Sequence, residues 1–290
     1  MAAPLLSDGV VELRPEADEG VFRVEHEGQP VGQVAVRPLS ADEGELSWSL
    51  QDDQRGHGYA TRAVRLLVEH ALGELGLTRV QARVALGNDR AMRVATRAGL
   101  MREGVRREDP AVEAGTGSVV LARLRSDPPI TEPGAFRALL NSFLPRKRAI
   151  AQMLVRDPEE RVLLCRLTYK QDWDLPGGVV EVGESPQQAV SREVEEELGL
   201  QVPAGDLLLT DWLPPWGGWD DAICLVFDGG VQDASLMSGA VLQPREIRAV
   251  QFCSAQEVRQ HCADFTARRI EAALAALHGG GTPYTESGRP

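Results

Sequence analysis

A proline-rich segment near the middle of the chain, SDPPITEPG at 126–134, separates two halves that each alternate strand-like and helix-like patterns. Its three prolines and its lack of apolar periodicity are typical of a linker. A chain of 290 residues can supply a hydrophobic core to each of two domains. We therefore predict an α+β protein with a first domain at 1–125, a linker at 126–136 and a second domain at 137–290.

In the first half, short alternating segments such as VFRVEHEG and VGQVAV predict β-strands. A helix is predicted from about Tyr59, because apolar residues from Val64 to Leu75 recur at helical spacing. A second short helix is predicted between Asn88 and Gly99.

The second half begins with FRALLNSFL, which predicts a helix, and continues with AIAQMLVRD and RVLLCRLTY, which predict paired strands. A helix is predicted from Ser185, a good N-cap followed by Pro186, to a stop at Gly199. A last amphipathic helix is predicted over about 255–277. The segment 278–290 is rich in glycine and is predicted to be mobile unless Tyr284 docks it.

The charge balance limits the partners of the chain. With 31 basic and 43 acidic side chains the net charge is −12, and no basic stripe supports binding to nucleic acid or to an anionic membrane. No apolar run approaches the roughly 18 residues of a spanning helix, and residues 1–8 lack the basic start of a signal peptide. The four cysteines form no CxxC pair, which favours free thiols in a reducing cytoplasm. The oligomeric state stays open.

An acidic segment in the second half, SREVEEELGL at 191–200, carries the strongest chemical signal. Glu193, Glu196 and Glu197 stand at i, i+3 and i+4, so their carboxylates share one face of the predicted helix. Charged helices usually have a solvated face, and spacing alone favours that interpretation. The alternative is a site for a hard divalent cation, since clustered carboxylate oxygens suit magnesium.

The flanking residues favour the cation site. Together with these residues, the acidic face resembles the Nudix box in every fixed position. The pattern is Gly178, five residues, Glu184, seven residues, Arg192-Glu193, an aliphatic residue, Glu196-Glu197, and then Gly199 with an aliphatic residue. The preceding WDLPGG at 173–178 also resembles the start of this motif. The resemblance implies an α/β/α sandwich with a mixed sheet. It also implies hydrolysis of a diphosphate linkage in a nucleoside diphosphate joined to another moiety.

Carried over by position, the resemblance also assigns roles. Magnesium (or manganese) would be bound by the carbonyl of Gly178 and by the three carboxylates of the acidic helix face. Glu184 and Arg192 would form an orienting salt bridge. The chemistry agrees, because a diphosphate is anionic and cations must neutralise its oxygens and activate a water. A further carboxylate outside the box would serve as a base or ligand, and we favour Glu246 over Asp220 and Asp221, although the sequence does not decide among them.

Substrate selection has one candidate element, the loop TDWLPPWGGWDD at 210–221 with Trp212, Trp216 and Trp219. These rings would either stack on a nucleobase or fix an irregular loop to the domain, and both interpretations stay open. Pro215 lies fifteen residues after Leu200, which resembles a feature of ADP-ribose-type Nudix enzymes.

A glycine-containing loop in the first half, at 53–61, follows a predicted strand and leads into the helix predicted from Tyr59. Backbone N–H groups of such a loop and the positive helix end form a site for a diphosphate. Arg55, Gly58 and Ala60 resemble the R-x-x-G-x-A loop of GNAT acetyltransferases, and the helix from Asn88 to Gly99 resembles a second motif of that family. The resemblance implies a mixed sheet with helices and a site for acetyl-coenzyme A or coenzyme A. It would be formed by Arg55, Gly56, His57, Gly58, Tyr59, Ala60, Thr61 and Asn88.

Acetyl transfer by this domain stays open. The family places two helices between its first two strands, and the interval from Pro15 to Gly20 is too short for them. The second motif has Ala91 where a hydroxyl residue is common, and no well-placed tyrosine follows Gly99. Glu45 is a candidate base, although an exposed strand glutamate is the simpler interpretation. We predict a Nudix hydrolase; the alternatives are an N-acetyltransferase with an accessory Nudix domain, or a nucleotide or coenzyme A sensor.

Overall fold

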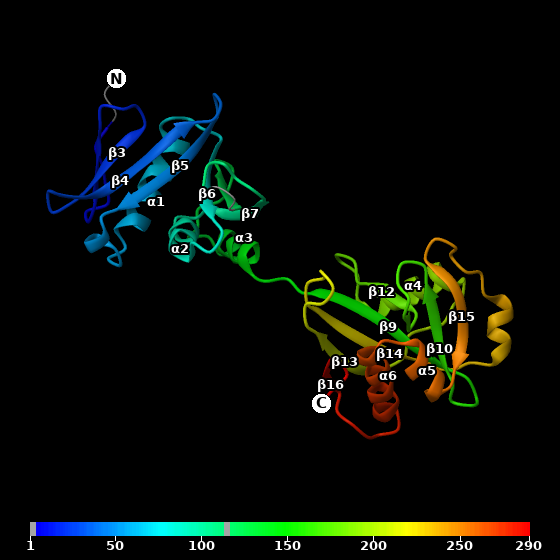
Figure 1. Cartoon of the computed structure of the whole chain (residues 1–290). Helices are drawn as coiled ribbons and strands as arrows, with labels where there is room; N and C mark the ends of the chain where they lie inside the picture. Colours follow the sequence, from blue (N-terminus) through cyan, green and yellow to red (C-terminus); the bar gives the residue numbers. More distant parts are fainter. Residues whose placement is uncertain (1–3, 113–116) are drawn as a thin grey trace. The chain divides into compact units, whose positions relative to one another are not determined.

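The computed structural model describes residues 4–112 and 117–290, and the chain divides into two compact units, one ending at Pro145 and the other beginning at Arg146. Each unit has its own mixed sheet and its own hydrophobic core (Figure 1). The predicted α+β class is confirmed. No helix in the described part of the chain has the length and apolar character needed to cross a membrane.

The first unit contains one sheet in the order β1-β2-β3-β4-β5-β6-β8-β7, in which β5 and β6 are parallel and the other neighbours are antiparallel. Its strands are β1 (Leu6–Ser7), β2 (Glu12–Pro15), β3 (Val21–His26), β4 (Gln29–Pro38), β5 (Glu43–Leu50), β6 (Arg79–Ala85), β7 (Met101–Arg106) and β8 (Ser118–Leu124). Its helices are the 3-10 turn η1 (Asp52–Gln54), α1 (Tyr59–Gly73), α2 (Asp89–Arg97) and α3 (Pro133–Phe143).

The core of the first unit lies between the sheet and the helices α1 and α2. Alternate residues of the strands, such as Leu13, Phe22 and Val80, are buried against the apolar stripe of α1. The residues between them carry ion pairs instead, among them the one between Arg79 and Glu103. The predicted alternation therefore places the helices on one face of the sheet.

The helix α3 differs from our prediction, which assigned it to the second domain. Leu139 is buried, Phe143 packs against the core of the first unit, and the hydroxyl of Ser142 accepts the backbone N–H of Arg102 at 3.1 Å. Pro133 begins this helix, because proline suits the first helical turn. The prolines that we assigned to a linker therefore precede a helix of the first unit.

The second unit contains one sheet in the order β11-β10-β9-β14-β13-β16, with β12 on β9 and β15 on β10. Its strands are β9 (Arg148–Arg156), β10 (Val162–Leu167), β11 (Trp173–Asp174), β12 (Gly177–Val179), β13 (Leu207–Leu213), β14 (Ala222–Val231), β15 (Ile247–Cys253) and β16 (Tyr284–Glu286). Its helices are α4 (Pro186–Leu198), the 3-10 helix η2 (Ala234–Gly239), α5 (Ala255–His261) and α6 (Asp264–Leu277).

This sheet lies between two helical layers. Along β9, Ala151 and Met153 belong to the core that α4 covers, whereas Leu154 belongs to the core that α5 and α6 cover. The predicted α/β/α sandwich with a mixed sheet is confirmed (Figure 1).

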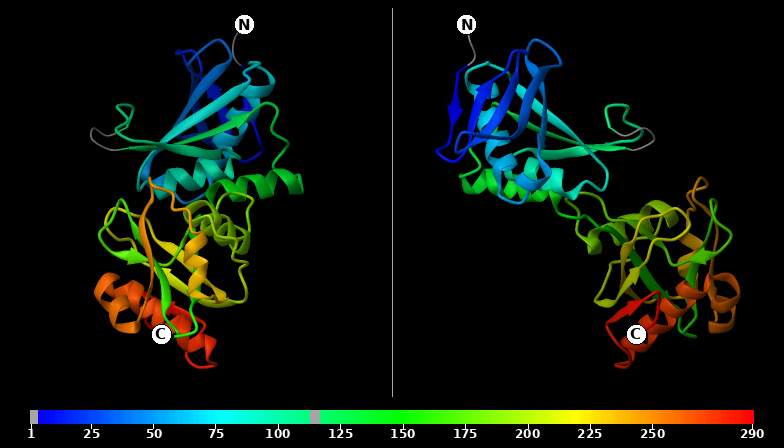
Figure 2. Two further views of the ribbon diagram at one scale, coloured as in Figure 1. Left: turned by 90° about the vertical axis from the view of Figure 1, so that its right-hand side faces the viewer. Right: turned by 60° about the vertical axis from the view of Figure 1, so that its left-hand side comes forward.

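Two details after β15 differ from the prediction. The expected single helix is broken, because Cys262 is extended (φ −91°, ψ 155°) and forms a bridge with Trp173. The segment after α6 is not loose: β16 runs parallel to β13, close to α6 (Figure 2). The fully buried residue of β16 is Thr285, and Tyr284 is 46% exposed.

We expect a fragment of residues 146–290 to fold cooperatively, because its two cores involve residues of the second unit alone. A fragment that starts at 137 retains part of α3 without its packing surface and should be less soluble. Thermal unfolding of both fragments by circular dichroism is the measurement. A fragment 146–290 that shows no cooperative transition would contradict the division at Arg146.

Candidate active site

The acidic helix α4 is held at both ends by local sequence. The hydroxyl of Ser185 accepts the backbone N–H of Gln188, and the Gln188 side chain returns to the backbone of Ser185, which forms a capping box. Gly199 ends the helix in the left-handed conformation (φ 66°). Before the helix, β12 pairs with β9 and carries Gly177 and Gly178. These contacts bring the glycines and the helix together.

Both glycines are closely packed. A Cβ atom on Gly177, whose φ is 137°, would lie 2.2 Å from the carbonyl oxygen of Ala151. A Cβ atom on Gly178 would lie 2.5 Å from the carboxyl carbon of Glu193. The carboxylate of Glu193 therefore occupies the space that a side chain at Gly178 would need.

The carboxylate of Glu197 lies beside that of Glu193 and is 5% exposed. Its Oε2 accepts the N–H of Gly177 at 3.1 Å. Burial, with the charges of Glu193 and Glu246, raises the pKa of Glu197 to about 8 despite this hydrogen bond. Burial also raises the pKa of Glu193. The field at this position therefore favours the arrival of a positive charge.

Arg192 interacts with the remaining acidic residues. Its Nε and Nη2 donate to the two oxygens of Glu184 at 2.9 and 3.0 Å, so the predicted salt bridge forms with bidentate geometry. Its Nη1 donates to Glu193 at 3.1 Å and to Glu196 at 3.0 Å. The side chain of Glu196 is 62% exposed at the edge of the site.

The structure thus brings Glu193 and Glu197 to the glycine turn and leaves Glu196 on Arg192. Consistent with this, no group of three acidic, histidine or cysteine side chains converges within 4–112 and 117–290. The donor set still fits a hard divalent cation: two neighbouring carboxylates with raised pKa values and the adjacent Gly178. Arg192 engages Oε2 of Glu196, so this exposed side chain would have to rotate, with its Oε1 toward the other two carboxylates, to join them.

Among the three candidates for the further carboxylate, Glu246 stays the one we favour. Its charge raises the pKa of both Glu193 and Glu197. Asp221 instead pairs with Lys147 and with the indole of Trp212, and the backbone carbonyl of Asp220 accepts Arg148. Glu246 therefore acts on the acidic face through its charge, whereas the side chain of Asp221 and the backbone of Asp220 are engaged by other residues.

Two neighbours of the site were missed from the sequence. Asp174 accepts Lys170 at 2.6 Å and raises the pKa of Glu197, and the WDLPGG segment could have indicated it. The pKa of Tyr169 is raised to about 12 by partial burial and by the carboxylates of Glu197, Asp174 and Glu246. No sequence pattern singled out Tyr169.

The tryptophan loop ends in a tight hairpin. Trp216 and Trp219 exchange backbone hydrogen bonds across Gly217 and Gly218, both with positive φ. The guanidinium of Arg148 lies 4.8 Å from the ring of Trp219, but the two tryptophans are 59% and 60% exposed. The loop is thus fixed by its turn, and its rings stay accessible for stacking.

The glycine loop of the first unit lies where two parallel strands diverge. β5 pairs with β6 only from Glu43 to Glu45, and the loop follows the unpaired end of β5. Gly56 and Gly58 have φ of 89° and 84°, and Gly58 offers no side chain to cap α1. Within the described residues, no acceptor is assigned to the backbone N–H groups from Gly56 to Thr61. They are therefore available to an anion.

The side chains predicted to bind the cofactor have other partners. Arg55 pairs with Asp52 at 2.7 Å, and the exposed ring of His57 stacks on Tyr59 with centroids 5.5 Å apart. The side chain of Asn88 accepts the N–H of Ala91 and caps α2. Ala60 and Thr61 lie in the first turn of α1. The backbone of this loop is therefore its principal binding group.

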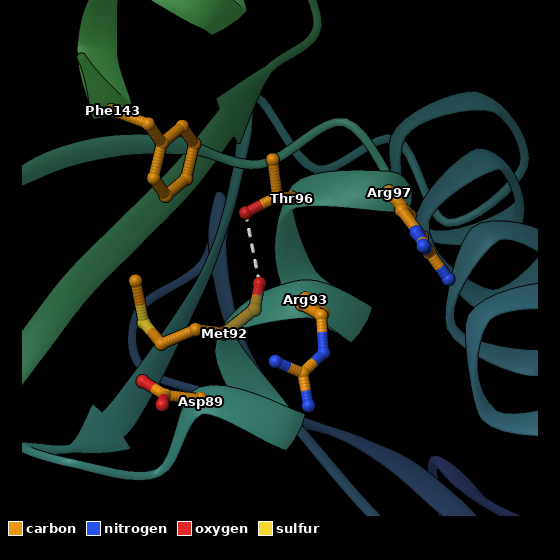
Figure 3. A pocket seen from close by; sticks show the side chains of 6 residues that line it. All are labelled: Asp89, Met92, Arg93, Thr96, Arg97 and Phe143. Carbon is orange, nitrogen blue, oxygen red and sulfur yellow. Dashed lines mark hydrogen bonds between the residues drawn. The ribbon is translucent and has the colours of Figure 1, made fainter. Parts of the chain in front are cut away.

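The acceptor side of the first unit is reduced, as expected. A turn from Glu16 to Gly20 connects β2 to β3 without a helix. Glu45 is held by Arg83, with 2.7 Å between Oε2 and Nη2, which weakens its case as a base. A pocket of about 340 Å³ lies elsewhere on the unit, between α2 and Phe143, and contains no residue of the glycine loop (Figure 3).

Comparison with known proteins agrees with this division. Residues 145–274 match the NUDIX domain, and residues 10–101 match the acetyltransferase (GNAT) domain. The chain is 33% identical over 143 residues to a MutT-like protein of Streptomyces ambofaciens, a match that covers 48% of this chain and 81% of that protein. The chain belongs to the Nudix family. It joins a GNAT acetyltransferase domain to a Nudix hydrolase domain, so the resemblances noted in the sequence are confirmed.

Two further relatives are matched over shorter parts. The chain is 35% identical over 97 residues to nucleoside triphosphatase NudI of Salmonella agona, covering 32% of this chain and 64% of that protein. It is 45% identical over 78 residues to an octanoyltransferase of Myxococcus xanthus, covering 24% of this chain and 22% of that protein. The chain thus spans only about a fifth of the octanoyltransferase.

Proposed function

We propose that the second domain hydrolyses a diphosphate linkage in a nucleoside diphosphate joined to another moiety, with Mg²⁺ or Mn²⁺ as cofactor. The observation that carries this proposal is the pair of carboxylates at the glycine turn: Glu193 against Gly178, and buried Glu197 on the N–H of Gly177. Glu193 is paired with Arg192, but no salt bridge to Glu197 is found among the described residues, so its buried charge is unfavourable without a compensating cation.

Each residue of the site has a role in this reaction. Glu193, Glu196, Glu197 and the Gly178 carbonyl would hold the cation, which neutralises phosphate charge and activates a water when bound. Glu184 and Arg192 fix the rotation of the acidic face through their bidentate pair. Glu246, whose charge acts on Glu193 and Glu197, would take a proton from the attacking water on its carboxylate oxygen.

The moiety on the diphosphate would be selected by the tryptophan hairpin. Backbone pairing across Gly217 and Gly218 fixes the turn, and the exposed rings of Trp216 and Trp219 contact Phe265 and Arg148, so a nucleobase could stack there at reduced entropic cost. The similar NudI protein is named a nucleoside triphosphatase, so triphosphates are the competing substrates.

The four cysteines are buried and unpaired, which supports a reducing, cytoplasmic location.

A substrate panel tests the reaction. Purified protein with Mg²⁺ or Mn²⁺ would be incubated with dinucleoside diphosphates, sugar nucleotides, coenzyme A and nucleoside triphosphates, and phosphorylated products would be separated by chromatography. We expect cleavage between the two phosphorus atoms of a nucleoside diphosphate derivative. Cleavage of triphosphates alone would overturn the substrate class, and no cleavage in any reaction would overturn the activity.

For the first domain we propose binding of coenzyme A or acetyl-coenzyme A at the backbone of residues 55–61. The diverging strands β5 and β6 and the free N–H groups support it. Acetyl transfer is the second candidate function, and the pairing of Glu45 with Arg83 together with the short turn after β2 makes it the weaker one.

We expect Gly58→Asp to weaken coenzyme A binding at least tenfold, because it places a negative side chain against the bound diphosphate. Isothermal titration of the full chain measures this. Gly279→Asp is the matched control, since Gly279 also has a positive φ (76°) and open surroundings, and it belongs to the second unit. Equal affinity of both variants and wild type would remove the loop from the site.

A further inference from the structure

A chain of buried polar side chains crosses the second unit and is not used by the reaction proposed above. It connects five elements through Thr285 on β16, Asp211 on β13, Arg269 on α6, Gln152 on β9 and Asp174 on β11. The first four are at most 5% exposed. Buried polar groups are costly unless they are paired, so a network of this length restricts the structure to one arrangement.

The chain begins in the segment 282–289, which contains β16. Oδ1 of Asp211 accepts the hydroxyl of Thr285 at 2.7 Å and the N–H of Gly288 at 2.8 Å. Oδ2 of Asp211 accepts Nε of Arg269 at 2.8 Å, which pairs the two buried charges. Asp211 therefore ties the position of the guanidinium to this segment.

Arg269 in turn determines the orientation of an amide. Oε1 of Gln152 accepts Nη1 of Arg269 at 2.9 Å and the thiol of Cys224 at 3.3 Å. Because both groups are donors, Nε2 of Gln152 must face the other way, and it donates to Oδ1 of Asp174 at 2.8 Å. The opposite orientation would set the amide oxygen against a carboxylate. The donors and acceptors thus specify a single orientation.

Gln152 contacts both ends of the turn from Asp174 to Gly177, which leads to Gly178, the glycine proposed to bind the metal. Its side chain fixes Asp174, and its backbone pairs with Gly177 in the β9–β12 ladder. The N–H of Leu175 also donates to Asp174 at 2.9 Å, so the turn is closed at its start. Any shift of Gln152 therefore moves Gly177 and the neighbouring Gly178.

We propose that Gln152 is a positioning residue for the metal site, and that Asp211 and Arg269 extend its hold to the segment 282–289. The proposal rests on the proposed function of Gly178, Glu193 and Glu197 as cation ligands. In this arrangement the affinity for the cation depends on β16, a strand that contributes no ligand to the metal site.

Mn²⁺ binding by the full chain, followed by electron paramagnetic resonance of the free ion, tests the proposal. Gln152→Glu keeps the acceptor for Arg269 but sets a second carboxylate against Asp174, and should raise the dissociation constant about 10- to 100-fold. Combining it with Asp174→Asn restores a donor opposite an acceptor, but the amide nitrogen then takes the place of the oxygen that accepts the N–H of Leu175. The double variant should recover part of the affinity, a result that general loosening of the fold does not produce.

Thr285→Val tests the far end of the chain and should weaken Mn²⁺ binding several-fold. Thr282→Val is its matched control, because the hydroxyl of Thr282 contacts only the backbone of Tyr284. Circular dichroism establishes whether each variant is folded. If Gln152→Glu does not fold, the Mn²⁺ affinity of Thr285→Val decides whether the positioning role holds.

Wild-type affinity in both Gln152→Glu and Thr285→Val would overturn the positioning role and leave the proposed function intact. Loss without recovery in the double variant would also overturn it. A wild-type protein that binds no Mn²⁺ would overturn the proposed function and this inference together.

Discussion

Replacing Glu197 with glutamine should reduce diphosphate hydrolysis on the order of a thousandfold while the protein stays folded. A bound cation contributes several kcal/mol of charge stabilisation in the transition state, and each 1.4 kcal/mol is a factor of ten in rate. The amide keeps the shape of the side chain beside Gly177 but lacks the charge that holds the cation. Initial rates at saturating Mg²⁺ on the best substrate of the panel are the measurement.

The same variant should be more stable than wild type in the absence of metal. Burial beside Glu193 and Glu246 raises the pKa of Glu197, so the folded state disfavours this charge, and its removal should raise the melting temperature by about a few degrees. Glu195→Gln is the matched control, since Glu195 is exposed on the same helix and bonds to Gln201. Comparable loss of rate in both variants would contradict a specific role for Glu197.

Alanine at the two adjacent glycines should separate folding from function. At Gly177 the new methyl group would meet the Ala151 carbonyl at 2.2 Å with φ at 137°, and we expect a loss of about 3 kcal/mol or more in unfolding free energy. At Gly178 it would meet the end of the Glu193 side chain, which can rotate away. Gly178→Ala should therefore keep its stability and lose Mn²⁺ affinity by about 10- to 100-fold.

Chemical denaturation and Mn²⁺ titration together measure this contrast. If Gly178→Ala binds Mn²⁺ as wild type does, Glu193 is not held at the site by the space that the glycine provides. If Gly177→Ala unfolds at the wild-type denaturant concentration, the close approach to β9 is not needed for the fold.

The acidic helix was predictable from the sequence because its determinants are local. The cap at Ser185, the stop at Gly199 and the spacing from Glu184 to Arg192 all act within one helix and its ends. The spacing also put three carboxylates on one face, but it could not show that Arg192 engages Glu193 and Glu196 while Glu193 and Glu197 lie at the glycines. That outcome depends on side-chain rotation and burial.

Features that depend on contacts between distant residues could not be predicted from the sequence. Thr285 is buried by contact with Asp211, 74 residues earlier, and no local pattern in a glycine-rich segment indicates this. The proline segment resembled a linker, yet α3 after it packs on the first unit through Leu139 and Phe143. Among three candidate carboxylates, only the tertiary structure shows that the charge of Glu246 acts on Glu193 and Glu197.

The guanidinium of Arg192 supplies a positive charge at the acidic face where the cation is proposed to bind. It shares its charge among Glu184, Glu193 and Glu196, so α4 has a counter-charge of its own before any metal arrives. Many small metal sites fold only when loaded, because their ligands repel one another when empty. Here binding exchanges one partner of Glu196 for another. Under the proposed function, removal of the cation by a chelator would then stop the activity reversibly, and the protein would stay folded without the cation.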